Sequence, residues 1–366
     1  MPNVASGHTC VQNKKGVQFF TTVIRTFLFT SAAHGADLSV IDRYIRMEME
    51  LNGVPGAAIA VFLKGEVKYA KGFGVRSTVT NEPMTADTPV DLASVSKSLT
   101  AVAVNQLSRQ GKIDLAAPVT KYLSELGAEF TRIRIRHLIT HTSGLTRRDD
   151  YLVPCCGTAG EYDLDLAAAR LAAAKPSTTP PGEFVYANSN YVLLAAIVQR
   201  VSGQSFPVFM RESVFRPLGM SRTTLNPAEA HRWGLADPHE RLLQGVQPIG
   251  SPFLGWYGSS LVKSTARDMA GYLGWVLSTG TRSNSAPYDN GWFIRRRQEW
   301  PGSPTVLEHG GDTSGGNTAA IVVPAWELAA VVLLNLGAHR AAEIARGVLA
   351  RAAGLSGPPP RKGSQE

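Results

Sequence analysis

The chain has 366 residues, of which 44% are hydrophobic and 18% charged, and its formal net charge at pH 7 is +8. Ordinary apolar content and low charge content argue against a disordered chain, and the length exceeds one compact core, so we expect two lobes. The basic residues are scattered, and their one cluster, residues 295–297, has no interleaved aromatic side chains. Composition therefore gives no indication of a nucleic-acid partner.

The first 36 residues have the features of an export signal. They contain Lys14, Lys15 and Arg25 but no acidic residue, and an apolar run over residues 26–33 is followed by small residues. That run is too short to span a bilayer. We therefore expect a signal peptide over residues 1–36, a mature protein without a membrane span, and a periplasmic or secreted location.

Apolar patterning beyond the leader predicts strands near both ends of the chain and helices between them. The expected elements are a hairpin over 57–70, helices over 91–111, 191–201 and 266–277, strands over 292–297, 305–308, 317–323 and 328–334, and a closing helix over 341–352. This order indicates an α+β fold, in which both chain ends form one antiparallel sheet flanked by helices and a helical lobe is inserted.

The same order divides the residues after the leader into two lobes. We expect an α/β lobe of residues 37–96 and 278–356 and a helical lobe of residues 97–277. The last ten residues, 357–366, include three consecutive prolines and are expected to form a disordered tail. A cleft between the lobes is the expected place for an active site.

A serine three residues before a lysine, at a helix start, is the arrangement of an activated nucleophile. Residues three apart on a helix are neighbours, so the amine of Lys97 can reach the hydroxyl of Ser94. Burial and the helix start both disfavour the charged form of Lys97, which would let it take the serine proton. The helix start also directs the backbone N–H of Ser94 towards a reacting carbonyl, as half of an oxyanion hole.

Two further short motifs follow in the chain, Tyr186-Ala187-Asn188 and His309-Gly310-Gly311. Each motif alone is weak, because the segment 260–263 repeats the Ser-x-x-Lys spacing and the segment 288–290 repeats Tyr-x-Asn. Order and setting favour the first set, since a long apolar-rich helix follows Ser94, whereas Ser260 lies in the glycine-rich run 255–260. The sequence thus predicts a serine hydrolase that works through an acyl-enzyme, in preference to a simple helix cap at that serine.

Together the motifs resemble those of the penicillin-recognising serine hydrolase superfamily, which includes class C β-lactamases, D-alanyl-D-alanine peptidases and family VIII esterases. The resemblance runs from about Leu38 to Leu355 and includes the stretches 54–57, 135–145 and 258–268. As a set, these motifs are specific for the superfamily. They are not specific for a substrate.

The resemblance implies catalytic roles for three residues. Ser94 would be the nucleophile, Lys97 its partner, and Tyr186 a proton carrier for attack and for the leaving group. Either Lys97 or Tyr186 can be the working base, since an adjacent ammonium would favour the phenolate. The residues that the resemblance places against the substrate are Asn188, His309, Gly310, Gly311 and Asp312, the last through a backbone N–H that completes the oxyanion hole.

Two departures from the family pattern affect the expected substrate. β-Lactamases of this group carry a lysine where this chain has His309, and histidine is largely uncharged at neutral pH. This difference favours less anionic esters or amides over β-lactams. The carboxylate of Asp312 would oppose an oxyanion, so we expect it to point away from the site.

No metal or cofactor is expected. His137 and His141 have the four-residue spacing of a helical metal site, but no glutamate follows His137, and no Gly-x-Ser-x-Gly elbow is present. The leading hypothesis is hydrolysis of a small ester or peptide-like amide through an acyl-Ser94 intermediate. The alternatives are a dedicated class C-like β-lactamase and a penicillin-binding or sensor protein that deacylates slowly. The sequence does not indicate an oligomeric state.

Overall fold

The computed structural model describes residues 38–153, 163–173, 181–250, 255–280, 286–337 and 340–355. The expected signal peptide and the expected tail both lie outside the described residues. Contacts along the chain group Ala36–Glu366 into one unit, which contains every described residue.

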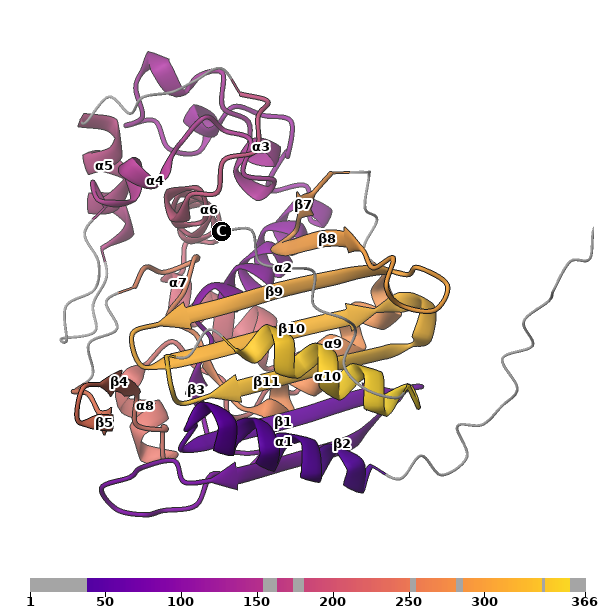
Figure 1. Ribbon diagram of the computed structural model, residues 1–366. Coiled ribbons are helices and arrows are strands. Elements are labelled where there is room, and N and C mark those ends of the chain that lie inside the picture. Colours follow the sequence, from indigo (N-terminus) through magenta and orange to yellow (C-terminus); the bar gives the residue numbers. More distant parts are fainter. Residues whose placement is uncertain are drawn as a thin grey trace, which may run out of the picture. The chain divides into compact units, whose positions relative to one another are not determined.

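The largest element of this unit is a seven-stranded antiparallel sheet with strands from both ends of the chain (Figure 1). The strand order is β2-β1-β11-β10-β9-β8-β7. This arrangement confirms the expected α+β fold. The strands are β1 (Gly56–Leu63), β2 (Glu66–Gly74), β7 (Tyr288–Asp289), β8 (Trp292–Arg296), β9 (Thr305–Thr313), β10 (Gly316–Val323) and β11 (Leu328–Leu334).

Each face of the sheet contributes to a separate hydrophobic core, because side chains on a strand alternate between faces. On β1, Ala57, Ile59 and Val61 belong to one core, whereas Ala58 and Ala60 belong to the other. The helices α1 (Ser39–Asn52) and α10 (Ala341–Ala352) cover the first face. The second face is covered by α9 (Ala266–Thr279), and its core continues into the helices around α2 (Ser96–Arg109).

Most of the remaining helices lie between α2 and α9 in the chain. The central one is α6, in which every residue from Ser189 to Val198 is buried, as expected for a core helix that is surrounded by other elements. The helices of this region are α3 (Ile135–Ile139), α4 (Arg147–Asp150), α5 (Leu164–Ala173), α6 (Asn188–Ser202), α7 (Phe206–Phe209) and α8 (Pro227–Arg232), with a π-helical turn at Met210–Phe215 and short 3-10 helices at Val119–Lys121 and Ala128–Phe130.

Two small sheets were not expected from the sequence. One pairs β3 (Val90–Asp91) with β6 (Lys263–Ser264), and the other pairs β4 (His239–Leu242) with β5 (Gly245–Pro248). Strands of two to four residues carry too little alternation to be recognised in a sequence. The last short element is a 3-10 turn, η5, at Pro324–Trp326.

Helix α9 lies on the sheet, although its residues fall within the segment that the sequence assigns to the helical lobe. Strand β9 is longer than the apolar pattern predicts: it extends to Thr313 rather than ending at residue 308. Its second half contains two glycines and an aspartate, which are depleted in strands, so the sequence pattern hides it. This extension carries the His-Gly-Gly motif into the sheet.

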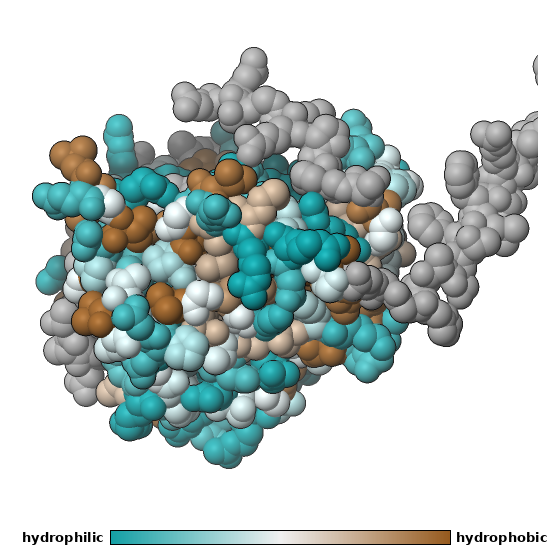
Figure 2. Space-filling view, turned by 60° about the horizontal axis from the view of Figure 1, so that its bottom comes forward, coloured by the Kyte–Doolittle hydropathy of each residue, from teal (hydrophilic) through white to brown (hydrophobic). Residues whose placement is uncertain are grey.

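Within the described ranges, no single helix is both long and apolar enough to cross a membrane. The bent pair Asn188–Ser202 and Phe206–Phe215 has the length and apolar composition of a membrane span only when its two helices are taken together. Figure 2 shows the face that lies below α1 and β2 in Figure 1. Apolar residues on that face are interspersed with hydrophilic ones. Met47 and Leu51 of α1 and Val67 of β2 are among the exposed apolar side chains.

Candidate active site

The predicted nucleophile lies on a short 3-10 turn, η1 (Ala93–Val95), directly before α2. Ala93 has a φ of 46°, in the left-handed region that residues other than glycine rarely adopt. Strained positions of this kind are common at functional sites. The turn buries the side chains of Ala93 and Val95 and leaves Ser94 partly accessible.

Gly311 of β9 is packed directly against this turn. A Cβ atom at Gly311 would lie 2.2 Å from the carbonyl oxygen of Leu92, so only glycine permits the approach. The Thr318 hydroxyl on neighbouring β10 donates a hydrogen bond to the same carbonyl at 3.0 Å. The sheet and the helix that carries Ser94 are therefore fixed to each other at this point.

Lys97, the second residue of α2, is fully buried and reaches three oxygen atoms. Its Nζ lies 3.0 Å from Ser94 Oγ, 2.8 Å from Asn188 Oδ1 and 2.9 Å from the carbonyl oxygen of Ser259. Burial lowers the pKa of Lys97 from 10.5 to about 7, and the charge of Asp150 acts in the opposite direction. Lys97 can therefore be neutral at physiological pH.

Tyr186 approaches the same serine from the segment that precedes α6. Its hydroxyl donates a hydrogen bond to Ser94 Oγ at 3.0 Å, and Lys97 Nζ lies 4.9 Å from the centre of its ring. Burial raises the pKa of Tyr186 well above its usual value, although the hydrogen bond to Ser94 acts against the rise. Tyr186 is therefore protonated at neutral pH.

Asn188 is the first residue of α6 and connects Lys97 to a carboxylate that sequence reasoning missed. The Asn188 Nδ2 group donates to Asp150 Oδ2 at 3.1 Å, and the backbone N–H of Ser189 donates to Asp150 Oδ1 at 2.7 Å. Asp150 is the last residue of α4 and is only 6% exposed. Nothing in the sequence links this aspartate to a motif that lies 38 residues further on.

The side chain of His309 is buried among aromatic rings. Its Nε2 lies 3.1 Å from the Tyr288 hydroxyl, and its ring centre is 5.3 Å from that of Phe293 and 6.2 Å from that of Tyr186. Burial, together with the charge of Lys97, lowers the pKa of His309 to about 3. At neutral pH this residue is uncharged and in contact with Tyr288, which belongs to the segment that duplicates the Tyr-x-Asn motif.

His141 packs against Tyr186 and the start of α6. Its Nδ1 accepts hydrogen bonds from the backbone N–H of Ala187 at 3.3 Å and from Asn190 Nδ2 at 3.0 Å, and its ring centre lies 4.4 Å from that of Tyr186. His137 instead accepts a hydrogen bond from the backbone N–H of Arg134. Among the described residues, no group of three or more histidine, cysteine or acidic side chains could hold a metal ion.

Strand β9 presents an open edge beside Ser94. In the described part of the chain, β8 pairs with β9 only from Thr305 to Glu308, so the following residues, His309 to Thr313, have one edge outside the ladder. An unpaired strand edge can bind an extended substrate through its backbone groups. Gly310 is exposed on this edge.

Asp312 lies on the opposite face of β9 from Gly311. Its carboxylate accepts a hydrogen bond from Asn317 Nδ2, and Asn317 Oδ1 in turn accepts from the backbone N–H of Ala341 at the start of α10. The side chain thus points towards the start of α10 and away from Ser94, as expected.

A pocket of about 420 Å³ opens beside Tyr186 and is lined by Thr146, Arg147, Arg148, Val185 and Tyr186. Both arginines are exposed.

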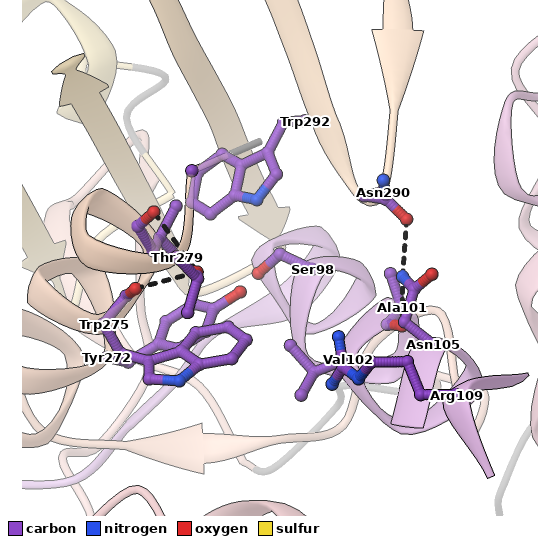
Figure 3. Close-up of a pocket in the computed structure, with 12 residues that line it drawn as sticks. Ser98, Ala101, Val102, Asn105, Arg109, Tyr272, Trp275, Thr279, Asn290 and Trp292 are labelled. Atoms are coloured by element: carbon purple, nitrogen blue, oxygen red, sulfur yellow. Dashed lines mark hydrogen bonds between the residues drawn. The ribbon is translucent and has the colours of Figure 1, made fainter. Parts of the chain in front are cut away.

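A second cavity of about 290 Å³ lies against a different part of α2, and Figure 3 shows side chains from α2, α9 and β8 pointing into it. None of the predicted catalytic residues lines this second cavity. Its labelled residues are Ser98, Ala101, Val102, Asn105, Arg109, Tyr272, Trp275, Thr279, Asn290 and Trp292.

An antiparallel sheet with a serine, a lysine and a tyrosine converging at a helix start defines the class of proteins with a β-lactamase or transpeptidase-like fold. A sequence model of the Beta-lactamase family matches residues 41–353. The chain therefore belongs to the β-lactamase family, within the penicillin-recognising serine hydrolase superfamily that its motifs resemble.

Curated relatives share modest sequence identity with this chain. Protein flp of Staphylococcus aureus (strain MW2) is 24% identical over 324 residues, which cover 82% of this chain and 63% of that protein. The Beta-lactamase of Escherichia coli (strain K12) is 33% identical over 258 residues, which cover 68% of this chain and 62% of that protein. The chain thus matches less than two thirds of the length of either relative.

Solved structures show the same fold. The octameric penicillin-binding protein homologue from Pyrococcus abyssi superposes with a TM-score of 0.74 at 24% identity, over 87% of this chain and 78% of that one. EstCE1, a hydrolase with promiscuous acyltransferase activity, superposes with a TM-score of 0.72 at 20% identity, over 85% of this chain and 98% of that one. A class C beta-lactamase superposes with a TM-score of 0.70 at 21% identity, over 85% of this chain and 95% of that one.

Proposed function

We propose that this protein is an exported serine hydrolase that cleaves a small ester or a peptide-like amide through an acyl-Ser94 intermediate. One observation carries the proposal: Ser94 Oγ lies 3.0 Å from both Lys97 Nζ and the Tyr186 hydroxyl. These distances are within reach for direct proton transfer to and from the serine oxygen. The leader composition supports export.

Lys97 is the better candidate for the base of the first step. Burial lowers the pKa of Lys97 and raises that of Tyr186, so the amine is the group that can be free of its proton near neutral pH. In the proposed step, Lys97 takes the Ser94 proton while Ser94 Oγ forms a bond to the substrate carbonyl carbon. The backbone N–H groups of Ser94 and Asp312 would then stabilise the oxyanion.

Breakdown of the tetrahedral intermediate requires a proton on the leaving group. The Tyr186 hydroxyl can give its proton to the departing oxygen or nitrogen, and the nearby Lys97 ammonium, which holds the proton taken from Ser94, can then reprotonate the Tyr186 phenolate. The carbonyl–leaving group bond breaks and leaves an ester on Ser94. Water then attacks this ester, and the same groups take its proton and return one to Ser94.

The electrostatics of the strand side of the site support a substrate without a carboxylate at that position. His309 occupies the place of the family lysine, and it is buried, uncharged and in contact with Tyr288. It therefore cannot supply the cation that would attract an anionic group to β9. The naming of several relatives as β-lactamases keeps β-lactam turnover as the second candidate function.

A comparison of two substrates with and without Ser94 tests the proposal. A short-chain nitrophenyl ester and a chromogenic cephalosporin should be assayed with the wild-type protein and with the Ser94→Ala variant. Rapid ester turnover that the variant loses is the expected result. Rapid cephalosporin turnover alone would indicate a β-lactamase, and a stable adduct on Ser94 in a mass spectrum, without turnover, would indicate a penicillin-binding sensor. Activity that survives in Ser94→Ala would overturn the proposal.

A further inference from the structure

A buried carboxylate behind the site makes contacts that the proposed reaction steps do not use. Asp150 is not in contact with Ser94, yet both of its oxygen atoms are engaged by the first turn of α6. Oδ1 accepts from the backbone N–H of Ser189, and Oδ2 accepts from the side-chain amide of Asn188. Its charge also acts on the pKa of Lys97.

The chemistry of these contacts determines which way the Asn188 amide is turned. An ionised carboxylate can only accept hydrogen bonds, whereas an amide group has a donating and an accepting end. Asp150 therefore requires the NH2 end of Asn188 and leaves its oxygen end to face Lys97 Nζ, at 2.8 Å. A flipped amide would place two N–H groups against the amine.

The orientation of Asn188 matters because a neutral amine has two N–H bonds and one lone pair. The Asn188 oxygen and the Ser259 carbonyl, at 2.8 and 2.9 Å from Nζ, accept those two N–H bonds. The lone pair is then left for the third neighbour, the Ser94 hydroxyl at 3.0 Å. With Asn188 flipped, the amide N–H groups would compete for the same lone pair.

We propose that Asp150 is a positioning residue that locks the Asn188 amide with its oxygen towards Lys97, and so directs the Lys97 lone pair at Ser94. This inference rests on the proposed function and adds a residue to its site. Burial raises the pKa of Asp150, while the hydrogen bonds from Ser189 and Asn188 act in the opposite direction. The carboxylate form is required for the lock.

The titratable groups around Lys97 come from several elements. Asp150 is on α4, Tyr186 precedes α6, Tyr191 is on α6, His141 follows α3 and His309 is on β9. Burial keeps both histidines and both tyrosines uncharged near neutral pH. Among these neighbours, Asp150 is the one whose negative charge favours protonated Lys97.

The chain offers a matched pair of substitutions on one helical turn. In Asp150→Asn, the new amide oxygen can accept from Ser189, but its NH2 end faces Asn188 and requires that amide to flip. In Asp149→Asn, the lost carboxylate is also buried, but it accepts from the backbone N–H and hydroxyl of Thr146 and not from α6. Both variants replace a buried aspartate of α4 by asparagine, and of the two carboxylates only that of Asp150 acts on the pKa of Lys97.

We expect Asp150→Asn to lower kcat/KM by about 10- to 100-fold, the range for loss of a hydrogen bond to a charged group. The acid limb of its pH profile should move to lower pH, because a negative charge that favours the Lys97 ammonium is gone. Asp149→Asn should lower the melting temperature without moving the acid limb. An unshifted limb in Asp150→Asn, or the same shift in both variants, would overturn the proposal.

A double variant keeps the test decisive if Asp150→Asn folds poorly. In Asp150→Asn with Asn188→Asp, the amide at 150 donates to the carboxylate at 188, whose other oxygen accepts from Lys97. We expect this exchange to recover at least about tenfold in kcat/KM over Asp150→Asn and to move the acid limb to higher pH. Absence of recovery in a folded double variant contradicts the lock. If turnover did not depend on Ser94, the proposed function itself would be refuted.

Discussion

The pH dependence of turnover should report the charge state of Lys97. In the proposed first step only the neutral amine accepts the Ser94 proton, and burial places the pKa of Lys97 at about 7. Below that value the neutral fraction falls about tenfold per pH unit, so roughly one molecule in a hundred is competent at pH 5. A lysine with an ordinary pKa would place the limb more than three pH units higher.

A pH-stat assay with a neutral ester measures this limb directly, because the signal does not depend on the ionisation of a chromophore. We expect kcat/KM to rise with a slope of one between about pH 5 and 7 and then to level off. An unperturbed histidine would titrate in the same range, so His309→Gln serves as the control. Since His309 is already uncharged, this variant should keep the limb where it is.

Three results would refute the reasoning. A limb that disappears in His309→Gln would assign it to the histidine, and a profile that is flat from about pH 5 to 9 would show that no group with this pKa controls the reaction. A limb near pH 10 would show that the amine is not desolvated as its burial implies.

Three further predictions concern the same site. Tyr186→Phe should lower kcat by about 100-fold or more while leaving the fold intact, as judged by turnover and circular dichroism; near wild-type turnover would remove the phenol from the mechanism. Gly311→Ala should destabilise the protein by about 1–3 kcal/mol in chemical denaturation, because its Cβ would clash with Leu92, whereas Gly310→Ala, with its nearest atom 3.7 Å away, should cost less than about 1 kcal/mol; equal effects would contradict the close approach. Between pH 7 and about 10 an unfolded chain holds a proton on Lys97 that the folded protein has released, so the unfolding free energy should rise with pH by up to about 5 kcal/mol relative to Lys97→Met; parallel curves would contradict the low pKa.

Local patterns predicted much of the fold. The closing helix over 341–352 and the strand over 328–334 have the bounds expected from the sequence, because continuous apolar runs and helical periodicity are properties of neighbouring residues. The apolar pattern missed the second half of β9, since its glycines and aspartate form no strand pattern, and only the family resemblance placed the His-Gly-Gly motif on a strand. Pairing with β10 holds these residues extended, which is a long-range effect.

The motifs of the site were also visible in the sequence, and the segments that duplicate two of them contribute to the same site. The duplicate Tyr-x-Asn segment supplies Tyr288, which holds His309. In the duplicate Ser-x-x-Lys segment, Lys263 forms an ion pair with Asp91, and the preceding Ser259 carbonyl accepts from Lys97. Sequence order distinguished the catalytic motifs from the segments that duplicate them, whereas only the structure showed that both pack around one site.

By itself the sequence determined the superfamily resemblance, the sheet built from both chain ends, and the serine–lysine pair on one helix, because residues three apart on a helix must be neighbours. The tertiary structure decided the charge states and orientations of the ionisable side chains around the site. It desolvates Lys97 and His309, turns the Asp312 carboxylate to the far face of β9, and brings Asp150 against the first turn of α6. Burial and long-range contacts set these properties, and neither can be read from the spacing of residues along a chain.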